Sequence, residues 1–122
     1  MSSKKGDYIP PDKLSLYDKL IASNPGIERK GKSIPYTSHN GHMFTFLSAN
    51  GVVAIRLPEK ERELFLKKYK TRLMVANGIV MKEYVEVPDN LLKKTSQLKI
   101  YLDMSYDYIK TLKPKPTKKS KP

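Results

Sequence analysis

Three Asn-Gly pairs, at residues 40–41, 50–51 and 77–78, constrain the fold of this chain more than any other feature. An Asn-Gly pair between two apolar stretches favours a tight β-hairpin, because both residues of a type I′ turn need a positive φ angle. The stretch SIPYTS precedes the first pair, HMFTFLSA and VVAIRL flank the second, and RLMV and EYVEV lie on either side of the third. The middle of the chain therefore predicts antiparallel strands joined by hairpins.

A two-residue loop at 50–51 sets the register of the central hairpin, in which Phe46 faces Ile55. Thr45 and Arg56 then point to the opposite side of the sheet. We expect the following residues to share one face and to form the core: Phe44, Phe46, Val53, Ile55 and Leu57.

Three other segments have apolar residues at helical spacing. Asp12 is expected to cap a short helix that runs to about residue 23, and Pro58 suits the first turn of a second helix. Ser96 is expected to cap a long helix that ends near Leu112. The buried stripes of the three helices are expected to contain Leu14, Tyr17, Leu20 and Ile21 in the first, Leu64, Phe65, Leu66 and Tyr69 in the second, and Leu98, Tyr101, Leu102, Ser105, Tyr108, Ile109 and Leu112 in the third.

These elements predict a two-layer α+β fold in the order α-β-β-β-α-β-β-α. An antiparallel five-stranded sheet forms one layer, and the helices pack on one face of it. Residues 89–95 predict a turn or a short helical piece before the last helix. We expect a single domain over residues 12–112, with a flexible N-terminal lead at 1–11 and a disordered basic tail, rich in proline and lysine, at 113–122.

The composition excludes several classes of site and location. The chain has no cysteine, so it forms neither a disulfide nor a thiolate zinc site. No run of residues approaches the roughly 20 apolar residues that span a bilayer. The first eleven residues also lack the apolar region of a signal peptide. We expect a cytoplasmic protein with no membrane partner.

The sequence contains no catalytic motif. It has no Gly-x-Ser-x-Gly nucleophile elbow, no phosphate-binding glycine loop and no paired-carboxylate motif. The acids Glu59, Glu61 and Glu63 suit the first turn of a helix, where negative charge is favoured. We therefore expect no enzyme activity and no cofactor.

His39 and His42 are the only histidines, and they flank Asn40-Gly41. A two-residue hairpin places them directly opposite each other, roughly 5.5 Å apart at Cα, with both imidazoles on one face. A zinc site needs three or four ligands, however, and no acid is close in the sequence. The pair is a weak candidate for a metal site, and the alternative that we favour is a polar turn at the end of the sheet.

Positive charge is concentrated near the C-terminal end of the sequence. The net charge is +12, and residues 111–122 contribute five lysines and no acid. Spaced by prolines, such lysines neutralise phosphates without reading a base sequence, so they are candidate nucleic-acid-binding residues. They are Lys113, Lys115, Lys118, Lys119 and Lys121. An acidic protein surface would also suit them, and a tail that only improves solubility is the alternative.

Three separated motifs carry a resemblance to a known family. They comprise Asn40, Gly41, Met43 and Phe44; Arg56, Leu57 and Pro58; and the run Met81, Lys82, Glu83 and Tyr84 with Pro88. In this order they resemble the TfoX N-terminal-domain family over residues 34–115. The resemblance implies a two-layer fold of the kind shared with secretion-chaperone-like and YjbR-like domains. It implies little about function, because many members are small stand-alone proteins without an assigned activity.

The sequence thus leads to two functional hypotheses. The first is a non-catalytic interaction or regulatory domain of the TfoX N-terminal type, which binds a protein partner or a small ligand on its sheet or helix face. The alternative is weak, sequence-nonspecific nucleic-acid binding through the basic tail and the lysines of the domain.

Overall fold

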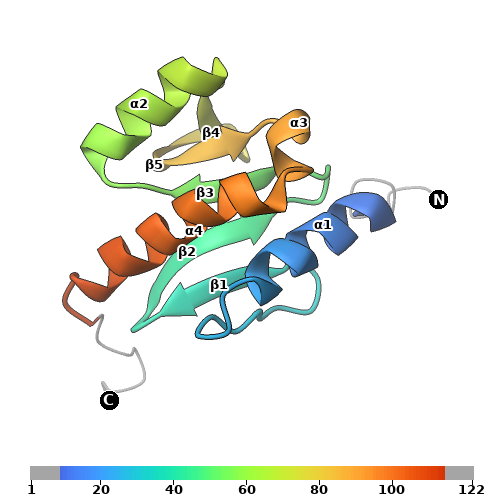
Figure 1. The fold of residues 1–122 in the computed structure, drawn as a ribbon, viewed down its shortest axis with the longest axis horizontal. Helices are drawn as coiled ribbons and strands as arrows, with labels where there is room; N and C mark the ends of the chain where they lie inside the picture. Colours follow the sequence, from blue (N-terminus) through green and yellow to red (C-terminus); the bar gives the residue numbers. More distant parts are fainter. Residues whose placement is uncertain (1–8, 115–122) are drawn as a thin grey trace.

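The computed structural model describes residues 9–114, which form one five-stranded antiparallel sheet and four helices (Figure 1). The strands are β1 (Tyr36–His39), β2 (His42–Leu47), β3 (Val53–Arg56), β4 (Leu73–Ala76) and β5 (Ile79–Val87). The helices are α1 (Pro11–Ala22), α2 (Glu59–Tyr69), α3 (Asp89–Leu92) and α4 (Thr95–Lys110). The strand order in the sheet is β1-β2-β3-β5-β4, so β1 and β4 are its edges. The predicted α+β class and order of elements are confirmed, and α3 is the expected short helical piece.

Two of the three Asn-Gly pairs form the tight turns that they predict. Asn40 and Gly41 have φ angles of 52° and 83°, and they join β1 to β2. Asn77 and Gly78 have φ angles of 52° and 77°, and they join β4 to β5. Both pairs therefore have the left-handed backbone of a two-residue hairpin loop.

The pair at 50–51 forms a longer loop than the sequence predicts. The backbone N–H of Ser48 donates to the carbonyl of Val52 at 2.9 Å, and the N–H of Gly51 donates to the carbonyl of Ser48 at 2.9 Å. Gly51 has a φ angle of 86°. This arrangement is a three-residue loop, residues 49–51, in which a turn is followed by one left-handed glycine.

The longer loop shifts the register of the central hairpin by one residue. Ile55 lies opposite Thr45, and Phe46 lies opposite Ala54. The expectation that Phe46 shares the core face with Ile55, while Thr45 points away, is wrong, because a one-residue shift turns each side chain to the other face. Thr45 is fully buried against α1, and Phe46 belongs to a separate cluster on the opposite face.

A bulge in β2 keeps Phe44 in the core despite this shift. Thr37 of β1 pairs with Thr45, but the next pair is Ser38 with Met43, which leaves Phe44 as an extra residue between them. The two residues 44 and 45 are consequently both buried on the helix side of the sheet. The sequence contains no signal for this bulge.

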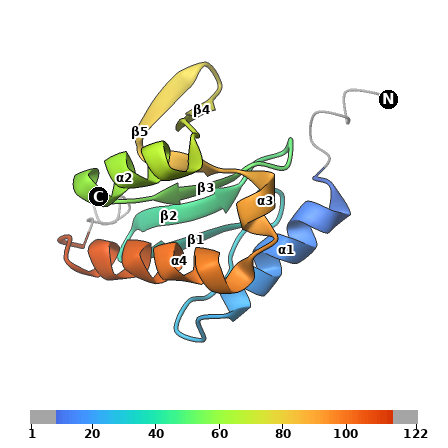
Figure 2. The same cartoon turned by 45° about the horizontal axis from the view of Figure 1, so that its top comes forward.

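All four helices contribute to a core on the same face of the sheet (Figures 1 and 2). In Figure 1 α4 lies across the middle of the sheet, with α1 on one side and α2 on the other. The buried core residues are Tyr17, Leu20, Ile21, Ile27, Phe44, Leu47, Val53, Ile55, Leu57, Phe65, Val85, Val87, Leu91, Leu92, Leu98, Leu102 and Ile109. The apolar cluster on the opposite face contains no helix residue among the described ones.

Several details of the helices differ from the sequence expectation. Pro10 and Lys94 occupy the N-cap positions of α1 and α4, so Asp12 and Ser96 are each the second residue of their helix rather than its cap. A proline next to the helix start has a backbone already suited to it, which replaces the expected side-chain cap. Leu64 is 58% exposed, because α2 buries only a narrow stripe centred on Phe65.

Candidate functional site

The face of the sheet opposite the helices, called the open face below, has an apolar centre. Phe46, Ala54 and Met74, from β2, β3 and β4, form a cluster with low exposure. Partly buried side chains surround this centre and are Tyr36, Met43, Val52, Met81 and Tyr84. These surrounding side chains leave the centre at most 7% exposed, so the exposed apolar side chains near this face are those of Ile34 and of the β4–β5 hairpin.

Tyr84 fixes the position of the strands beneath this face. Its hydroxyl donates a hydrogen bond to the carbonyl of Met43 at 2.6 Å, and its ring lies 5.8 Å from the ring of Phe46 between centroids. Burial raises the pKa of the Tyr84 hydroxyl, and the charge of nearby Arg56 opposes part of that rise. The hydroxyl is therefore neutral near pH 7, and Tyr84 acts as a structural link between β2 and β5.

The β4–β5 arm, residues 73–83, extends the apolar surface away from the body of the domain. β3 pairs with β5 only from Tyr84 to Val87, so residues 79–81 pair with β4 alone. Figure 2 shows this hairpin rising above the other strands. Val75 is 46% exposed, Ile79 is 67% exposed and Val80 is 49% exposed. An isolated two-stranded ribbon is marginally stable in water, so an apolar one suggests a partner.

A hollow connects the arm with the open face. Phe46 and Met74 of the open-face cluster line it together with Val75 and the exposed side chain of Ile34. Ser48, Ala49 and Asn50, at the end of β2 and in the loop after it, also line this hollow. Met74, Met81 and Ile79 point to the same side of the β4–β5 ladder, so the open face continues onto the arm through them. The side chains of Val75 and Val80 point to the other side of the arm.

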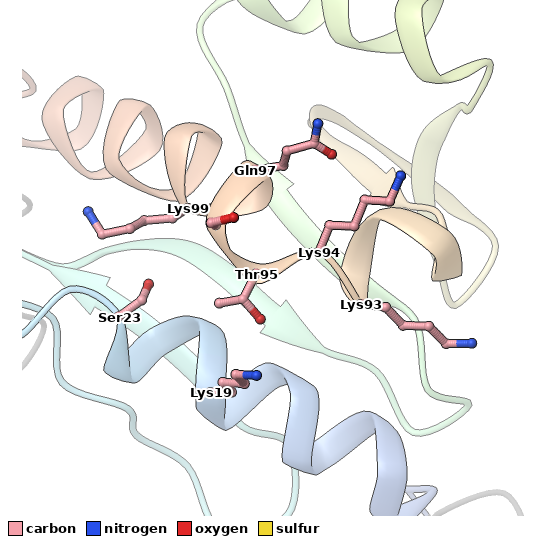
Figure 3. Close-up of a pocket in the computed structure, with 8 residues that line it drawn as sticks. Lys19, Ser23, Lys93, Lys94, Thr95, Gln97 and Lys99 are labelled. Carbon is pink, nitrogen blue, oxygen red and sulfur yellow. The ribbon is translucent and has the colours of Figure 1, made fainter.

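A basic hollow lies between the end of α1 and the start of α4 (Figure 3). Its lining residues are Lys19, Ser23, Lys93, Lys94, Thr95, Ser96, Gln97 and Lys99. The first turn of α4 has no side-chain cap, so the positive end of its dipole faces this region. The Oγ1 atom of Thr95 is buried and has no hydrogen-bond partner among the described residues. The hollow is thus electropositive and contains an unsatisfied hydroxyl.

The lysines surround this basic hollow rather than converge on one point. In Figure 3 the side chains of Lys93 and Lys94 point away from the space between Ser23 and Thr95. Lys99 is engaged elsewhere, because its ammonium lies 2.7 Å from a carboxylate oxygen of Asp103. The arrangement suits diffuse attraction of a polyanion better than tight enclosure of a small anion.

The two histidines lie where the hairpin predicts them. His39 pairs directly with His42 across β1 and β2. The ring of His39 meets the ring of Tyr106 edge-on, with centroids 5.5 Å apart, and Nε2 of His42 is 2.7 Å from the carbonyl oxygen of Lys113. Within residues 9–114, no group of three or more His, Asp or Glu side chains is placed to hold a metal ion. The observed contacts of the pair are structural.

Only one of the five candidate nucleic-acid-binding lysines of the tail falls within the described residues. Lys113 is exposed, and its carbonyl meets His42. Lys115, Lys118, Lys119 and Lys121 lie outside the described residues. The basic hollow is lined by other lysines, namely Lys19, Lys93, Lys94 and Lys99.

The family-motif residues meet one another in space, although they are far apart in the sequence. Besides the link from Tyr84 to Met43, Nε of Arg56 lies 2.6 Å from Oε1 of Glu83. Leu57 is fully buried, while Pro58 and Pro88 immediately precede α2 and α3. Met81 borders the open-face cluster, and Lys82 is exposed. These positions hold β2, β3 and β5 together, which is a structural role.

The sequence reasoning missed the arm and the basic hollow. Residues 73–81 form a run without a single charge in a chain that is 30% charged, and that contrast was the available signal for the arm. The basic hollow joins Lys19 to Lys99 across two helices, so no local pattern could reveal it.

Comparison with known proteins gives no match, whether with protein-family models, with curated proteins or with solved structures. Among residues 9–114, no helix is long and apolar enough to cross a membrane.

Proposed function

We propose that this chain is a non-catalytic interaction domain that binds a partner protein through the open face and the β4–β5 arm. The observation that carries the proposal is the exposure of Val75, Ile79 and Val80 on one protruding hairpin. Single exposed apolar residues are common on proteins, but a group that continues into an apolar hollow is typical of an interaction site. The net charge of +12 adds attraction for an acidic partner.

The family assignment and the cellular setting are proposals as well. Membership of the TfoX N-terminal-domain family is supported by the three sequence motifs, whose residues meet across β2, β3 and β5. A regulatory role in the cytoplasm is supported by that resemblance and by the absence of cysteine, which suits a reducing compartment.

Site-specific photo-crosslinking tests the interaction surface in the full chain. A benzoylphenylalanine is placed at Ile79 of the arm, and a matched control carries it at Ile100 of α4, which is 59% exposed on the helix side. We expect a discrete crosslinked protein from position 79 and none from position 100. The crosslinked protein is then purified and titrated against the wild-type chain and the Ile79→Asp variant, which should bind at least tenfold more weakly. Equal crosslinking at both positions, or equal binding by both chains, contradicts the proposal.

Weak binding of nucleic acid is a second candidate function, favoured by the basic hollow. Lys19, Lys93, Lys94 and Lys99 border it, and the start of α4 adds a fifth source of positive potential. Such binding would neutralise phosphates without reading bases, and it would weaken steeply as salt increases.

Fluorescence anisotropy with a generic DNA duplex and an RNA strand, over a salt series, tests this second candidate. The double variant Lys93→Glu/Lys94→Glu should lose affinity, while Lys60→Glu on α2, an exposed control, should lose little. Each phosphate contact removed should reduce the slope of log K against log salt by about 0.9 for a duplex. Deletion of residues 113–122 separates the contribution of the tail. No binding at low salt, or equal losses in the two lysine variants, contradicts a role for the hollow.

A further inference from the structure

β4 is an edge strand, and its outer side has no neighbouring strand in the described sheet. Ala76 and Ile79 close the two-residue turn, so they exchange ladder hydrogen bonds with each other. The alternation of an antiparallel ladder then directs the N–H and C=O groups of Val75 outward. The register shifts between Met74 and Leu73, so the outward direction of Leu73 is inferred from its neighbour Arg72. The carbonyl of Arg72 points toward β5, because it accepts a hydrogen bond of 2.9 Å from the N–H of Glu86. The groups of the next residue, Leu73, therefore point away from β5. No backbone hydrogen bond outside the strand pairs of residues 9–114 involves Leu73 or Val75.

The other edge of the sheet is protected. The N–H of Lys30 donates to the carbonyl of Tyr36 at 2.8 Å, and the N–H of Tyr36 donates back at 3.0 Å. Pro35 directly before β1 has no N–H to offer to an added strand. Strand edges are commonly blocked in these ways, because unpaired edges attract other chains. β4 therefore offers a free backbone edge where β1 does not.

The sequence of β4 lacks the features that keep other chains away from an edge. It reads Leu-Met-Val-Ala, with neither a charged residue nor a proline, and the uncharged run continues through the turn to Met81. Val75, half exposed, lies beside the apolar hollow that contains Ile34. An apolar edge of this kind invites aggregation unless a partner covers it.

The charge around the start of β4 indicates what kind of partner this is. Lys67, Lys68, Lys70 and Arg72 are exposed in the six residues before the strand. Arg72 pairs with Glu86 at 3.3 Å, whereas the three lysines form no ion pair within residues 9–114. A segment that runs antiparallel to β4 would have its C-terminal end at Leu73, next to the part of the chain that carries these cations. Acidic residues at that end complement them.

We propose that the outer edge of β4 binds an extended segment of the partner protein by strand addition, and that this segment has apolar residues followed by acidic ones. The inference rests on the proposed function and adds how the partner is bound, by addition of one of its strands to the sheet. Backbone groups of Leu73 and Val75 would supply hydrogen bonds, the side chain of Val75 would contact an apolar residue, and the cations before β4 would meet the acids. A second copy of this chain is disfavoured as the occupant, because it brings its own net charge of +12.

Amide NMR titration of the full chain tests the proposal with defined probes. The probe is the acetylated and amidated peptide TVTVEEE, and its charge-reversed control is TVTVKKK. We expect TVTVEEE to shift the amide signals of Leu73 and Val75 and to slow their hydrogen exchange, with affinity that falls as salt increases. TVTVKKK should bind at least tenfold more weakly.

Two proline variants separate the β4 edge from the rest of the arm. Val75 and Val80 lie opposite each other with similar exposure, 46% and 49%, and both N–H groups point out of the β4–β5 ladder, on opposite sides. Proline is tolerated at such positions and removes only the outward donor. Val75→Pro should weaken TVTVEEE at least tenfold, whereas Val80→Pro should change its affinity less than threefold. Unchanged amide signals outside the arm verify that both variants fold. The hydrogen-exchange measurement on the wild-type chain does not depend on either variant.

The remaining outcomes overturn the proposal in distinguishable ways. Equal weakening by both prolines, no effect of Val75→Pro, or tight binding of TVTVKKK contradicts strand addition at β4. If the amide signals of Leu73 and Val75 shift as the protein concentration rises, without any peptide, the edge of β4 binds a second copy of this chain and the proposal is wrong. If the crosslinked partner is lost in Ile79→Asp but unaffected by Val75→Pro, strand addition is wrong and the interaction domain stands. If no partner crosslinks at position 79 while TVTVEEE binds as expected, the proposed surface is wrong and the edge remains a binding site.

Discussion

The hydroxyl of Tyr17 on α1 lies 2.8 Å from Oγ1 of Thr45 on β2, and both side chains are fully buried. Oγ1 of Thr45 is also 2.8 Å from Oγ1 of Thr37 on β1. Three hydroxyls thus form a chain through the apolar core and join a helix to two strands. Because buried hydroxyls are costly without partners, this chain fixes the position of α1 over the bulged part of β2.

Thr45→Val should destabilise the protein more than Tyr17→Phe. The valine leaves the hydroxyls of Tyr17 and Thr37 buried without their shared partner, which costs about 2–4 kcal/mol. The phenylalanine leaves Thr45 bonded to Thr37 and costs about 1 kcal/mol. Urea unfolding followed by circular dichroism measures both values. If Thr45→Val proves as stable as Tyr17→Phe, the hydroxyl chain does not hold the helix in place.

This hydroxyl chain also shows where prediction from the sequence stops. The class of fold, the two tight hairpins and most of the core follow from Asn-Gly turns and apolar spacing, because those signals are local. The register around Thr45 does not follow, since a three-residue loop and a two-residue loop at 50–51 are both compatible with Asn-Gly. The bulge at Phe44 depends on the pairing of β1 with β2, which a local pattern does not encode.

The candidate sites divide in the same way. The cross-strand position of His39 and His42 was predictable from one turn. The basic hollow needs the packing of α1 beside α4, and the open edge of β4 needs the strand order of the whole sheet. Both are products of tertiary structure, so they could be found only after the fold was known.

Stability should fall between about pH 10 and pH 12. Burial raises the pKa of Tyr101 to about 12, and its hydrogen bond to the Tyr69 hydroxyl, 3.3 Å away, adds to the rise. Burial likewise raises the pKa of Tyr17 above its usual value. An unfolded tyrosine ionises near pH 10. The folded state therefore binds these protons more tightly than the unfolded state does. The resulting contribution to the free energy of unfolding is fully present below pH 10 and is lost as the pH rises toward the pKa of the folded state.

Urea unfolding at a series of pH values from 8 to 12 measures this loss. Tyr17→Phe should make the decline shallower, because it removes the most deeply buried phenol. Tyr36→Phe, which removes a half-buried phenol at the edge of the open-face cluster, is the control. An identical decline in wild type and Tyr17→Phe contradicts the assignment.

Gly31→Ala should destabilise the protein far more than Gly78→Ala. Both glycines have positive φ angles, 92° and 77°, so each alanine pays a backbone strain of about 1 kcal/mol. At Gly78 an added Cβ meets nothing within 4 Å, but at Gly31 it would lie 2.2 Å from the carbonyl oxygen of Ile34. The loop that protects the edge of β1 must then move, which we expect to cost at least 2 kcal/mol in total. Thermal unfolding of the two variants compares them directly, and equal melting temperatures contradict this packing.

Ile79→Thr should change the free energy of unfolding by less than about 0.5 kcal/mol, although it replaces a large apolar residue. Ile79 is 67% exposed on the arm, so little of its apolar surface is lost from the folded core. Met74→Thr is the matched comparison, because Met74 lies on the neighbouring strand of the same arm and is only 4% exposed. Removing it from the open-face cluster should cost about 2–4 kcal/mol. Urea unfolding gives both values. A large loss in Ile79→Thr would mean that the arm needs this side chain for its own stability, which would remove the reason to assign it to partner binding.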